Sequence, residues 1–297
     1  MGADAANPEA VARIFAAKGR PANHPVIVHL GSVEQLTDWA TDIPPAAYRL
    51  AQHFWPGPLT LILKRHARVS DAVTGGQDTV GLRVPGHPIA LALLAAFSGG
   101  IAAPSANRFG WLSPTTAAHV RAGLGASVDY VLDGGPCRVG IESTIIDLSG
   151  DYPRLLRPGT ITAAGIEAVL DKPLAAPAGE APHSPGMLPS HYAPQTALTL
   201  VSPDQLQGEI KRCLESGERV AVLARSAAPT LTKTNCIWQV MPDDPGAYAY
   251  ELYARLRELD ALHADRLLVE APPREAAWLA VRDRLVRAAH SGIDPRQ

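Results

Sequence analysis

Short apolar runs alternate with amphipathic segments along the first half of the chain. Residues 26–30 (VIVHL), 59–63 (LTLIL) and 79–84 (TVGLRV) are rich in aliphatic and β-branched residues and predict strands. Asn7 followed by Pro8 predicts the start of a helix, because Asn accepts hydrogen bonds from first-turn amides and Pro needs no amide donor there. This alternation is typical of an α/β fold.

Further elements are predicted between residues 30 and 170. Ser32 with Gln35 three residues later is a candidate capping box. Ser113 before Pro114 predicts a second helix start, and Thr162 predicts a third. The predicted strands are residues 101–103, 130–133 and 143–148, and the predicted helices are residues 88–97, 114–123 and 162–170.

Residues 171–194 differ in composition from the rest of the chain. They are rich in Pro, Ala, Gly and Ser and show no periodicity, which indicates a linker or a functional loop. Beyond them, strand and helix patterns alternate again and predict a small parallel sheet with helices on both faces. We therefore predict a first domain at 1–172, a linker at 173–195 and a second, smaller domain at 196–297.

Composition excludes several classes of protein. The chain has 27 Lys and Arg against 29 Asp and Glu, so its net charge of −2 does not favour a nucleic-acid or membrane-surface partner. No apolar run approaches the roughly 20 residues of a membrane span. The three cysteines lie far apart, which supports neither a disulfide framework nor a zinc site. These features predict a cytoplasmic protein with no membrane partner and no metal-ligand cluster.

The common nucleotide-binding, hydrolase and metalloprotease signatures are absent from the sequence. The candidate residues are instead polar groups in loops beside strands, where open α/β sheets build their sites. Arg83 lies in an apolar strand, and a buried guanidinium needs either a ligand anion or a structural salt bridge. Lys18 and Arg20 are also consistent with charges that complement a helix dipole, and His29 with a packed core histidine.

Several motifs occur together and in a fixed order. Together they resemble the YrdC-like family of L-threonylcarbamoyladenylate synthases, in the form that carries an additional C-terminal domain. The motifs are K-G-R-P at 18–21, F-W-P-G-P-L-T at 54–60, L-R-V-P at 82–85, A-P-S-A-N at 103–107, G-I-E-S-T-I-I-D at 140–147, L-R-P-G at 156–159, S-P-G-M at 184–187 and H-Y-A-P at 191–194.

The resemblance implies both a fold and a reaction. The implied fold is α/β, a twisted open sheet around an electropositive cavity, followed by a smaller Rossmann-like α/β domain. The implied reaction condenses L-threonine, bicarbonate and ATP, with Mg²⁺ on its phosphates, to threonylcarbamoyl-AMP and pyrophosphate. A chain that catalyses this reaction would be a nucleotidyltransferase. The product would pass to the machinery that transfers threonylcarbamoyl to the adenosine next to the anticodon of tRNA.

The resemblance also assigns roles to residues. Arg offers a planar fork to phosphate oxygens, Lys a point charge, and Ser and Asn neutral donors. The catalytic group around the phosphates is implied to be Lys18, Arg20, Ser105 and Asn107. Further ATP contacts are implied for His24, Thr79, Ser113, Arg157 and, from the linker, Tyr192. The threonine contacts are implied to be His29, Arg83, Ala103 and Ser143, with Arg83 on the carboxylate.

The chain departs from the family pattern at two places. His24 stands where family members usually have Asn, so an imidazole would replace an amide beside ATP. The family also has a strand and a helix before a P-T-E-T-V-Y-G segment whose second Thr contacts threonine, whereas this chain starts at Met1 inside that motif. We therefore expect a truncated sheet with unpaired backbone groups, low stability and little synthase activity.

Two other functions remain open at this point. One is an RNA-binding or ribosome-associated module, because a YrdC-like cavity has the size and charge to attract RNA. The near-neutral charge of residues 1–172 argues against it, so contact with tRNA is only weakly supported. The other is a carbamoyl-transfer domain of hydrogenase maturation proteins, but this chain has no acylphosphatase-like or zinc-finger region.

Overall fold

The computed structural model describes residues 1–175, 181–188, 191–228 and 235–290. The chain forms two compact units. The first unit comprises Met1–Phe109, Ala117–Gly135 and Glu142–Met187, and the second comprises Gly110–Thr116, Pro136–Ile141 and Leu188–Gln297. Two short segments that precede residue 172 thus belong to the second unit. The parts of the predicted linker at 176–180 and 189–190 lie outside the described residues.

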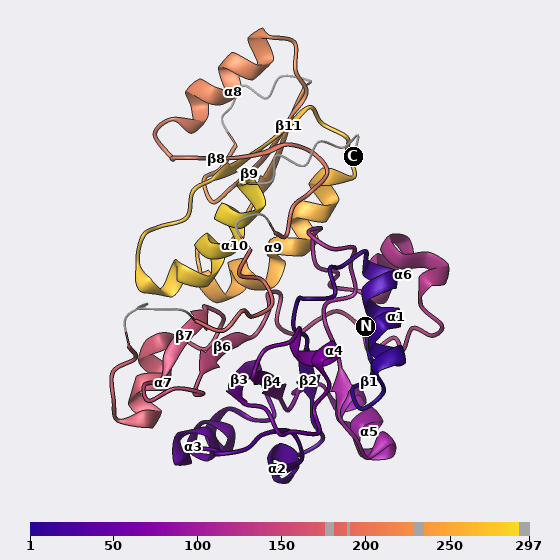
Figure 1. Ribbon diagram of the computed structural model, residues 1–297. Helices are drawn as coiled ribbons and strands as arrows, with labels where there is room; N and C mark the ends of the chain where they lie inside the picture. Colours follow the sequence, from indigo (N-terminus) through magenta and orange to yellow (C-terminus); the bar gives the residue numbers. More distant parts are fainter. Residues whose placement is uncertain (176–180, 189–190, 229–234, 291–297) are drawn as a thin grey trace. The chain divides into compact units, whose positions relative to one another are not determined.

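The first unit is built on a mixed sheet of seven strands, in the order β1-β5-β2-β4-β3-β6-β7 (Figure 1). The pairs β2–β4 and β3–β6 are parallel, and the other neighbours are antiparallel. The strands are β1 Ala3–Asp4, β2 Ile27–His29, β3 Leu59–Lys64, β4 Thr79–Arg83, β5 Ile101–Ala102, β6 Thr144–Asp147 and β7 Arg154–Arg157. The predicted twisted α/β sheet is therefore confirmed.

One face of this sheet forms the main core of the first unit. Its members share this face because alternate residues of a strand point the same way. At most 2% of each is exposed: Val28, Val80, Leu82, Leu61 and Ile146. Figure 1 shows α2 and α3 along one side of β2, β3 and β4. The helices of the first unit are α1 Pro8–Lys18, α2 Leu36–Trp39, α3 Pro45–Phe54, α4 Asp71–Thr74, α5 Pro88–Phe97, α6 Ala117–Leu124 and α7 Ala163–Leu170, with 3-10 turns at Val33–Gln35 and Gly125–Ser127.

Two of the predicted helix caps are confirmed. The Asn7 side chain accepts hydrogen bonds from the amides of Glu9 and Ala10, at 3.0 and 3.2 Å. Thr162 Oγ1 accepts one from Gly165 N at 3.2 Å. Both side chains satisfy first-turn amides that have no partner inside the helix.

Three local predictions are wrong. Residues 130–133 form no strand, and Tyr130 is 90% exposed, since no strand in the described part of the chain pairs with this segment. The helix predicted from 114 starts at Ala117, so Ser113 does not cap it. Ser32 makes no side-chain capping bond, and Gln35 Oε1 accepts its hydrogen bond from Gly31 N at 2.7 Å, which removes the expected capping box.

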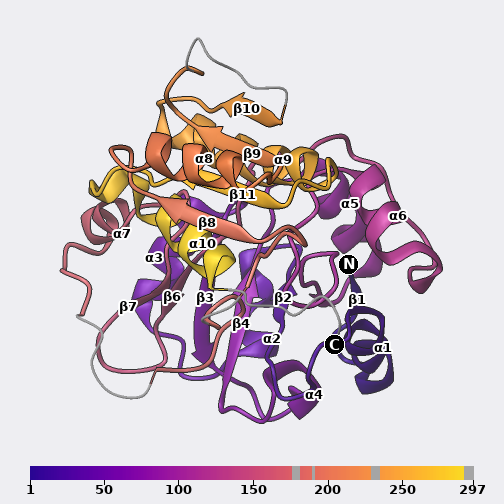
Figure 2. The same cartoon turned by 90° about the horizontal axis from the view of Figure 1, so that it is seen from above.

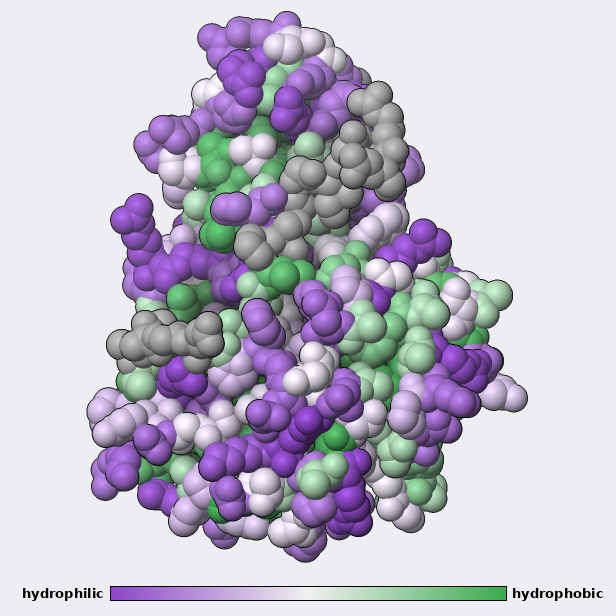
Figure 3. All heavy atoms as spheres, in the orientation of Figure 1, coloured by the Kyte–Doolittle hydropathy of each residue, from purple (hydrophilic) through white to green (hydrophobic). Residues whose placement is uncertain are grey.

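Helix α5 leaves much of its apolar surface exposed. Its sequence PIALALLAAF is nearly all apolar, yet only Leu94 is buried. Ile89, Leu93 and Phe97 are 41–45% exposed. In Figure 3, hydrophobic residues reach the surface on the side of the first unit where Figure 1 shows α5 and α6. None of the helices among the described residues is both long and apolar enough to span a bilayer.

The second unit is a parallel four-stranded sheet in the order β10-β9-β11-β8, with β10 at its edge (Figure 2). The predicted Rossmann-like arrangement is confirmed, because α8 packs on one face and α9 and α10 pack on the other. The strands are β8 Leu198–Val201, β9 Val220–Ala224, β10 Cys236–Val240 and β11 Arg266–Glu270, and the helices are α8 Leu206–Glu215, α9 Pro245–Asp260 and α10 Leu279–Ala289, preceded by a 3-10 turn at Ala276–Trp278.

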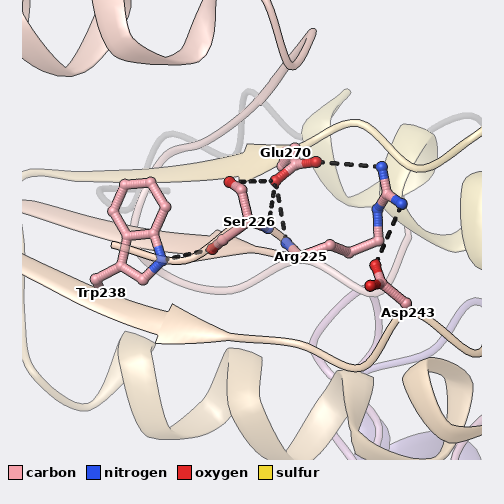
Figure 4. Close-up of polar contacts among 5 residues, drawn as sticks. All are labelled: Arg225, Ser226, Trp238, Asp243 and Glu270. Carbon is pink, nitrogen blue, oxygen red and sulfur yellow. Dashed lines mark hydrogen bonds and ion pairs between the residues drawn. The ribbon is translucent and has the colours of Figure 1, made fainter. Parts of the chain in front are cut away.

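A buried carboxylate fixes the ends of two neighbouring strands in the second unit (Figure 4). Glu270, at the end of β11, accepts hydrogen bonds from Arg225 N at 3.0 Å and from Ser226 N and Oγ at 3.1 and 2.9 Å. It also pairs with Arg225 Nη2 at 3.2 Å. Trp238 Nε1 donates to Ser226 O at 3.0 Å, which connects β10 to the same turn.

We predict that Glu270→Ala lowers the free energy of unfolding by about 3 to 5 kcal/mol, because it leaves several buried donors without their acceptor and removes the closer of the two carboxylates that pair with Arg225, the other being Asp243 at 3.5 Å. Urea denaturation monitored by tryptophan fluorescence measures this loss. Glu215→Ala is the matched control, since Glu215 forms only an exposed pair with Lys211 on α8 and its loss should cost less than about 0.5 kcal/mol. Equal effects of the two substitutions would contradict this role for Glu270.

Candidate active site

The sheet of the first unit places several predicted site residues on one face, opposite the main core. Thr79, Gly81 and Arg83 alternate along β4, and the register pairs Ile27 with Gly81 and His29 with Arg83. On the other side of β4, Ile62 of β3 is paired with Gly81. The parallel pairing of β3 with β6 aligns Thr60 with Ile145, so Ser143, two residues earlier, is on this face too. We call this the substrate face.

The middle of the substrate face is lined by apolar residues, and no side chain rises from the sheet at its centre, Gly81. Ile27, Ile62 and Ile145 form a small cluster there. Gly81 lies among them, and a Cβ at this position would come within 3.1 Å of Ile62 Cδ1 and 3.4 Å of Ile27 Cγ1. Glycine therefore keeps the floor of the face at the level of the backbone, with polar residues at both ends of β4.

His29 and Arg83 lie side by side at the C-terminal ends of β2 and β4. Burial, together with the charge of Arg83, lowers the pKa of His29 to about 3, so its imidazole is neutral near pH 7. Its buried Nδ1 has no hydrogen-bond partner among the described residues. The imidazole thus has one polar atom available to a ligand.

Arg83 has no carboxylate partner within the described parts of the chain. Its Nε donates to Gly57 O at 2.8 Å, which orients the guanidinium. Burial and the nearby charge of Arg157 lower its pKa to about 10. The structural salt bridge considered from the sequence is therefore not formed, and a partly desolvated cation without an anion is a favourable site for one.

The Ser143 hydroxyl is held between two neighbours. Arg157 donates from Nε to Ser143 O and from Nη2 to Ser143 Oγ, both at 3.0 Å. Thr60 Oγ1 lies 2.8 Å from Ser143 Oγ. This arrangement joins β3, the start of β6 and the end of β7, and it fixes the direction of the hydroxyl.

Lys18 is buried at the end of α1 and organises a loop. Its Nζ donates to the carbonyl oxygens of Ser105 and Asn107, at 2.6 and 2.5 Å. Burial, with a smaller contribution from Arg20, lowers the pKa of Lys18 to about 7. Lys18 therefore holds the A-P-S-A-N loop in place through main-chain contacts.

Arg20, His24 and Phe109 lie close together beside this loop. Arg20 Nη2 donates to Pro25 O at 2.6 Å, and its guanidinium lies 5.9 Å from the centre of the Phe109 ring. The His24 ring meets the same phenyl ring edge-on at 5.3 Å. Burial and the charges of Arg20 and His183 lower the pKa of His24.

The remaining predicted site residues have different surroundings. Ala103 donates its amide to Ile27 O at 2.9 Å and so continues the line of β5. Ser113 and Tyr192 belong to the second unit, where Ser113 O accepts from Arg257 Nε at 3.1 Å. Tyr192 is 1% exposed in the core of that unit, with its ring 5.7 Å from that of Tyr253.

Sequence reasoning did not single out three residues that the structure places beside these groups: Gly57, Thr60 and Gln77. Gly57 and Thr60 are part of the F-W-P-G-P-L-T segment, so the motif contained their signal. Gln77 carries no such signal. Among the described residues, no group of three or more His, Cys, Asp or Glu could hold a metal ion.

Two family descriptions match this chain. The family described as "Telomere recombination" matches residues 1–159, and the one described as "Threonylcarbamoyl-AMP synthase, C-terminal domain" matches residues 161–290. Together the two matches cover both halves of the chain.

Curated relatives and solved structures are similar over nearly the whole chain. The threonylcarbamoyl-AMP synthase of Bacillus subtilis is 40% identical over 97% of this chain and 86% of its own length. That of Pyrococcus abyssi is 38% identical, over 97% and 87%. The crystal structure of P. abyssi Sua5 complexed with L-threonine matches with a TM-score of 0.88 and 38% identity, over 97% of this chain and 86% of that one.

The lowered pKa of Lys18 leads to a prediction about stability. The unfolded chain keeps the Lys18 proton up to the ordinary pKa of 10.5, whereas the folded chain loses it near 7. Between about pH 7 and pH 10.5 the unfolded chain therefore binds one more proton than the folded chain. The free energy of unfolding consequently rises with pH across this range.

We therefore expect the free energy of unfolding of the wild type, relative to Lys18→Met, to rise between about pH 7 and pH 10. Urea denaturation across this range measures the difference. Lys211→Met, at an exposed lysine of α8, is the control and should give a flat difference. A flat difference for Lys18→Met as well would mean that Lys18 keeps its proton in the folded chain.

Proposed function

The chain belongs to the threonylcarbamoyl-AMP synthase family, and we propose that the substrate face of its first unit is where L-threonine, bicarbonate and ATP are condensed to threonylcarbamoyl-AMP and pyrophosphate. The observation that carries this proposal is the pair of His29 and Arg83: a buried, unpartnered Nδ1 beside a cation that has no carboxylate partner in the described residues. The family relationship favours a synthase over the RNA-binding module.

L-Threonine fits the C-terminal ends of β2 and β4. Its carboxylate would take the forked guanidinium of Arg83, because two parallel N–H···O bonds suit a planar carboxylate. The neutral imidazole of His29 and the oriented hydroxyl of Ser143 would bind the polar groups of the amino acid, and Ala103 would line the same pocket. A solved P. abyssi relative binds L-threonine, which supports this substrate for the family.

ATP would lie toward the other group of polar residues. Arg20, Ser105 and Asn107 would contact the phosphates, and Lys18 would hold the loop that carries the last two. Thr79 and Arg157, which lie on the substrate face, would be further ATP contacts, as would His24, which is beside Arg20. We treat Mg²⁺ as part of the nucleotide substrate, held by its phosphates.

The reaction needs few protein groups. Bicarbonate takes up a proton and loses water to give carbon dioxide, and the amine of threonine then forms a bond to its carbon and loses a proton, giving a carbamate. A carbamate oxygen then attacks the α-phosphorus while the bond to the bridging oxygen breaks and pyrophosphate leaves. The protein must hold the two anions in line and stabilise the departing charge, which are the roles of Arg83 and Arg20. The product would be used by the tRNA threonylcarbamoyl transfer machinery of the cytoplasm.

We predict that Arg83→Ala raises the KM for threonine by at least about 30-fold and changes the KM for ATP much less, because removing one partner of a buried ion pair costs about 2 to 5 kcal/mol. Arg83→Lys should give an intermediate loss, since it keeps the charge but not the fork. Pyrophosphate release, measured while each substrate is varied, separates the two constants.

Arg13→Ala is the control for this measurement, because Arg13 pairs with Asp129 at the exposed surface. It should leave both constants unchanged. Equal increases of the two constants in Arg83→Ala would contradict the assignment of Arg83 to the threonine carboxylate. A wild type that releases no pyrophosphate in a threonine-dependent manner would contradict the proposed function itself.

A further inference from the structure

One glutamine side chain holds the linker against the first unit. Gln77 Oε1 accepts a hydrogen bond from His183 N at 2.7 Å, and Gln77 Nε2 donates to His183 O at 3.0 Å. A carboxamide offers the same donor and acceptor as a peptide group, so it can pair with both main-chain groups of one residue as a neighbouring strand would. The two residues are 106 positions apart in the sequence.

A second side chain holds the linker two residues further on. Arg157 Nη1 donates to Pro185 O at 2.8 Å, while the same guanidinium binds Ser143 through Nε and Nη2. Gln77 lies just before the start of β4, and Arg157 is at the end of β7. Residues 183–185 are thus attached at two separate points of the first unit, and both neighbours of Ser184 are held through their main chain.

The Gln77 attachment lies next to the loop that carries His24. Gly75, with φ +64°, packs so closely that a Cβ there would lie 2.4 Å from Asn23 O. Val26 N donates to Val73 O at 2.9 Å, which holds the two loops together. Gln77 is two residues after Gly75, and Gly75 packs against the residue before His24. Because Gln77 binds His183, His183 lies close to His24.

Two basic side chains lie near enough to His24 to lower its pKa: Arg20 from the end of α1 and His183 from the linker. Asp78, the residue after Gln77, is directed to Arg65, with 3.8 Å between its Oδ1 and Arg65 Nη2. Three basic side chains from three segments therefore gather at one place. Such a gathering is stabilised when an anion with several oxygens binds to it.

We propose that Gln77 is the positioning residue that docks the linker, and that the docked linker presents the His183 imidazole to the phosphate oxygens of the nucleotide, beside His24 and Arg20. This inference rests on the proposed function, because the nucleotide supplies the anion. His183 is exposed, so its ring is accessible to a ligand from solvent. An imidazole can donate an N–H to a phosphate oxygen in its neutral form and gain charge beside it.

Hydrogen exchange tests the docking part on the full chain without any turnover. Gln77→Leu keeps the size of the side chain and removes both hydrogen bonds. We expect exchange of the His183 amide to become at least about tenfold faster, because the amide loses its acceptor. Gln52→Leu, at an exposed glutamine of α3, is the matched control and should leave that amide unchanged. Unchanged exchange in Gln77→Leu would overturn the docking role.

Binding of inorganic pyrophosphate, measured by calorimetry, tests the ligand class. We expect His183→Ala and Gln77→Leu each to weaken pyrophosphate binding by about 5- to 20-fold, as loss of a hydrogen bond to a charged group does. The double variant should be no weaker than either single one, because both remove the same contact. His53→Ala, at an exposed histidine of α3, is the control. Unchanged binding in His183→Ala, or fully additive losses, would overturn the proposal.

Kinetics connect the inference to the reaction. In His183→Ala and in Gln77→Leu, the KM for ATP should rise by a similar factor while the KM for threonine stays near its wild-type value. Equal effects on the two substrates would overturn the assignment of His183 to the phosphates. A wild type that binds pyrophosphate with help from His183 but shows no threonine-dependent turnover would refute the proposed function and leave the docking of the linker intact.

Discussion

The register of β2, β4, β3 and β6 is the constraint on which the rest of the first unit depends. Because side chains alternate between the faces of a strand, the same pairing that buries Val28, Val80 and Leu82 on one face puts His29 and Arg83 on the other. A slip of one residue would exchange the two sets, so burial of the core also fixes the position of the candidate site. Gly81 then keeps the centre of that face low enough for a substrate.

Much of this arrangement can be predicted from the sequence. Alternation of strand and helix patterns predicts the α/β class of both units, and Asn7 and Thr162 are helix starts that depend only on local hydrogen bonds. His29, Thr79, Arg83 and Ser143 share one sheet face because strand ends and their loops recur in a regular topology. Local chemistry and regular periodicity are the parts of the structure that a single sequence records well.

What could not be predicted depends on contacts between distant residues. Residues 130–133 have a strand-like composition, but a strand needs a pairing partner and this segment has none among the residues that the structure describes. Lys18 has the appearance of a phosphate-binding lysine, yet its Nζ is used on two main-chain carbonyls of a loop almost ninety positions away. The contact of Gln77 with His183 is of the same kind, because nothing in either local sequence indicates the other.

Arg157 shares one guanidinium between the Ser143 hydroxyl and the carbonyl of Pro185 in the linker. Any ligand that strengthens or weakens one of these hydrogen bonds changes the geometry available to the other. Thermodynamic linkage then requires reciprocity: if threonine at Ser143 favours attachment of the linker, attachment of the linker favours threonine to the same degree. The shared guanidinium thereby links occupancy of the Ser143 hydroxyl to the attachment of the linker at Pro185, which is separate from its attachment at Gln77.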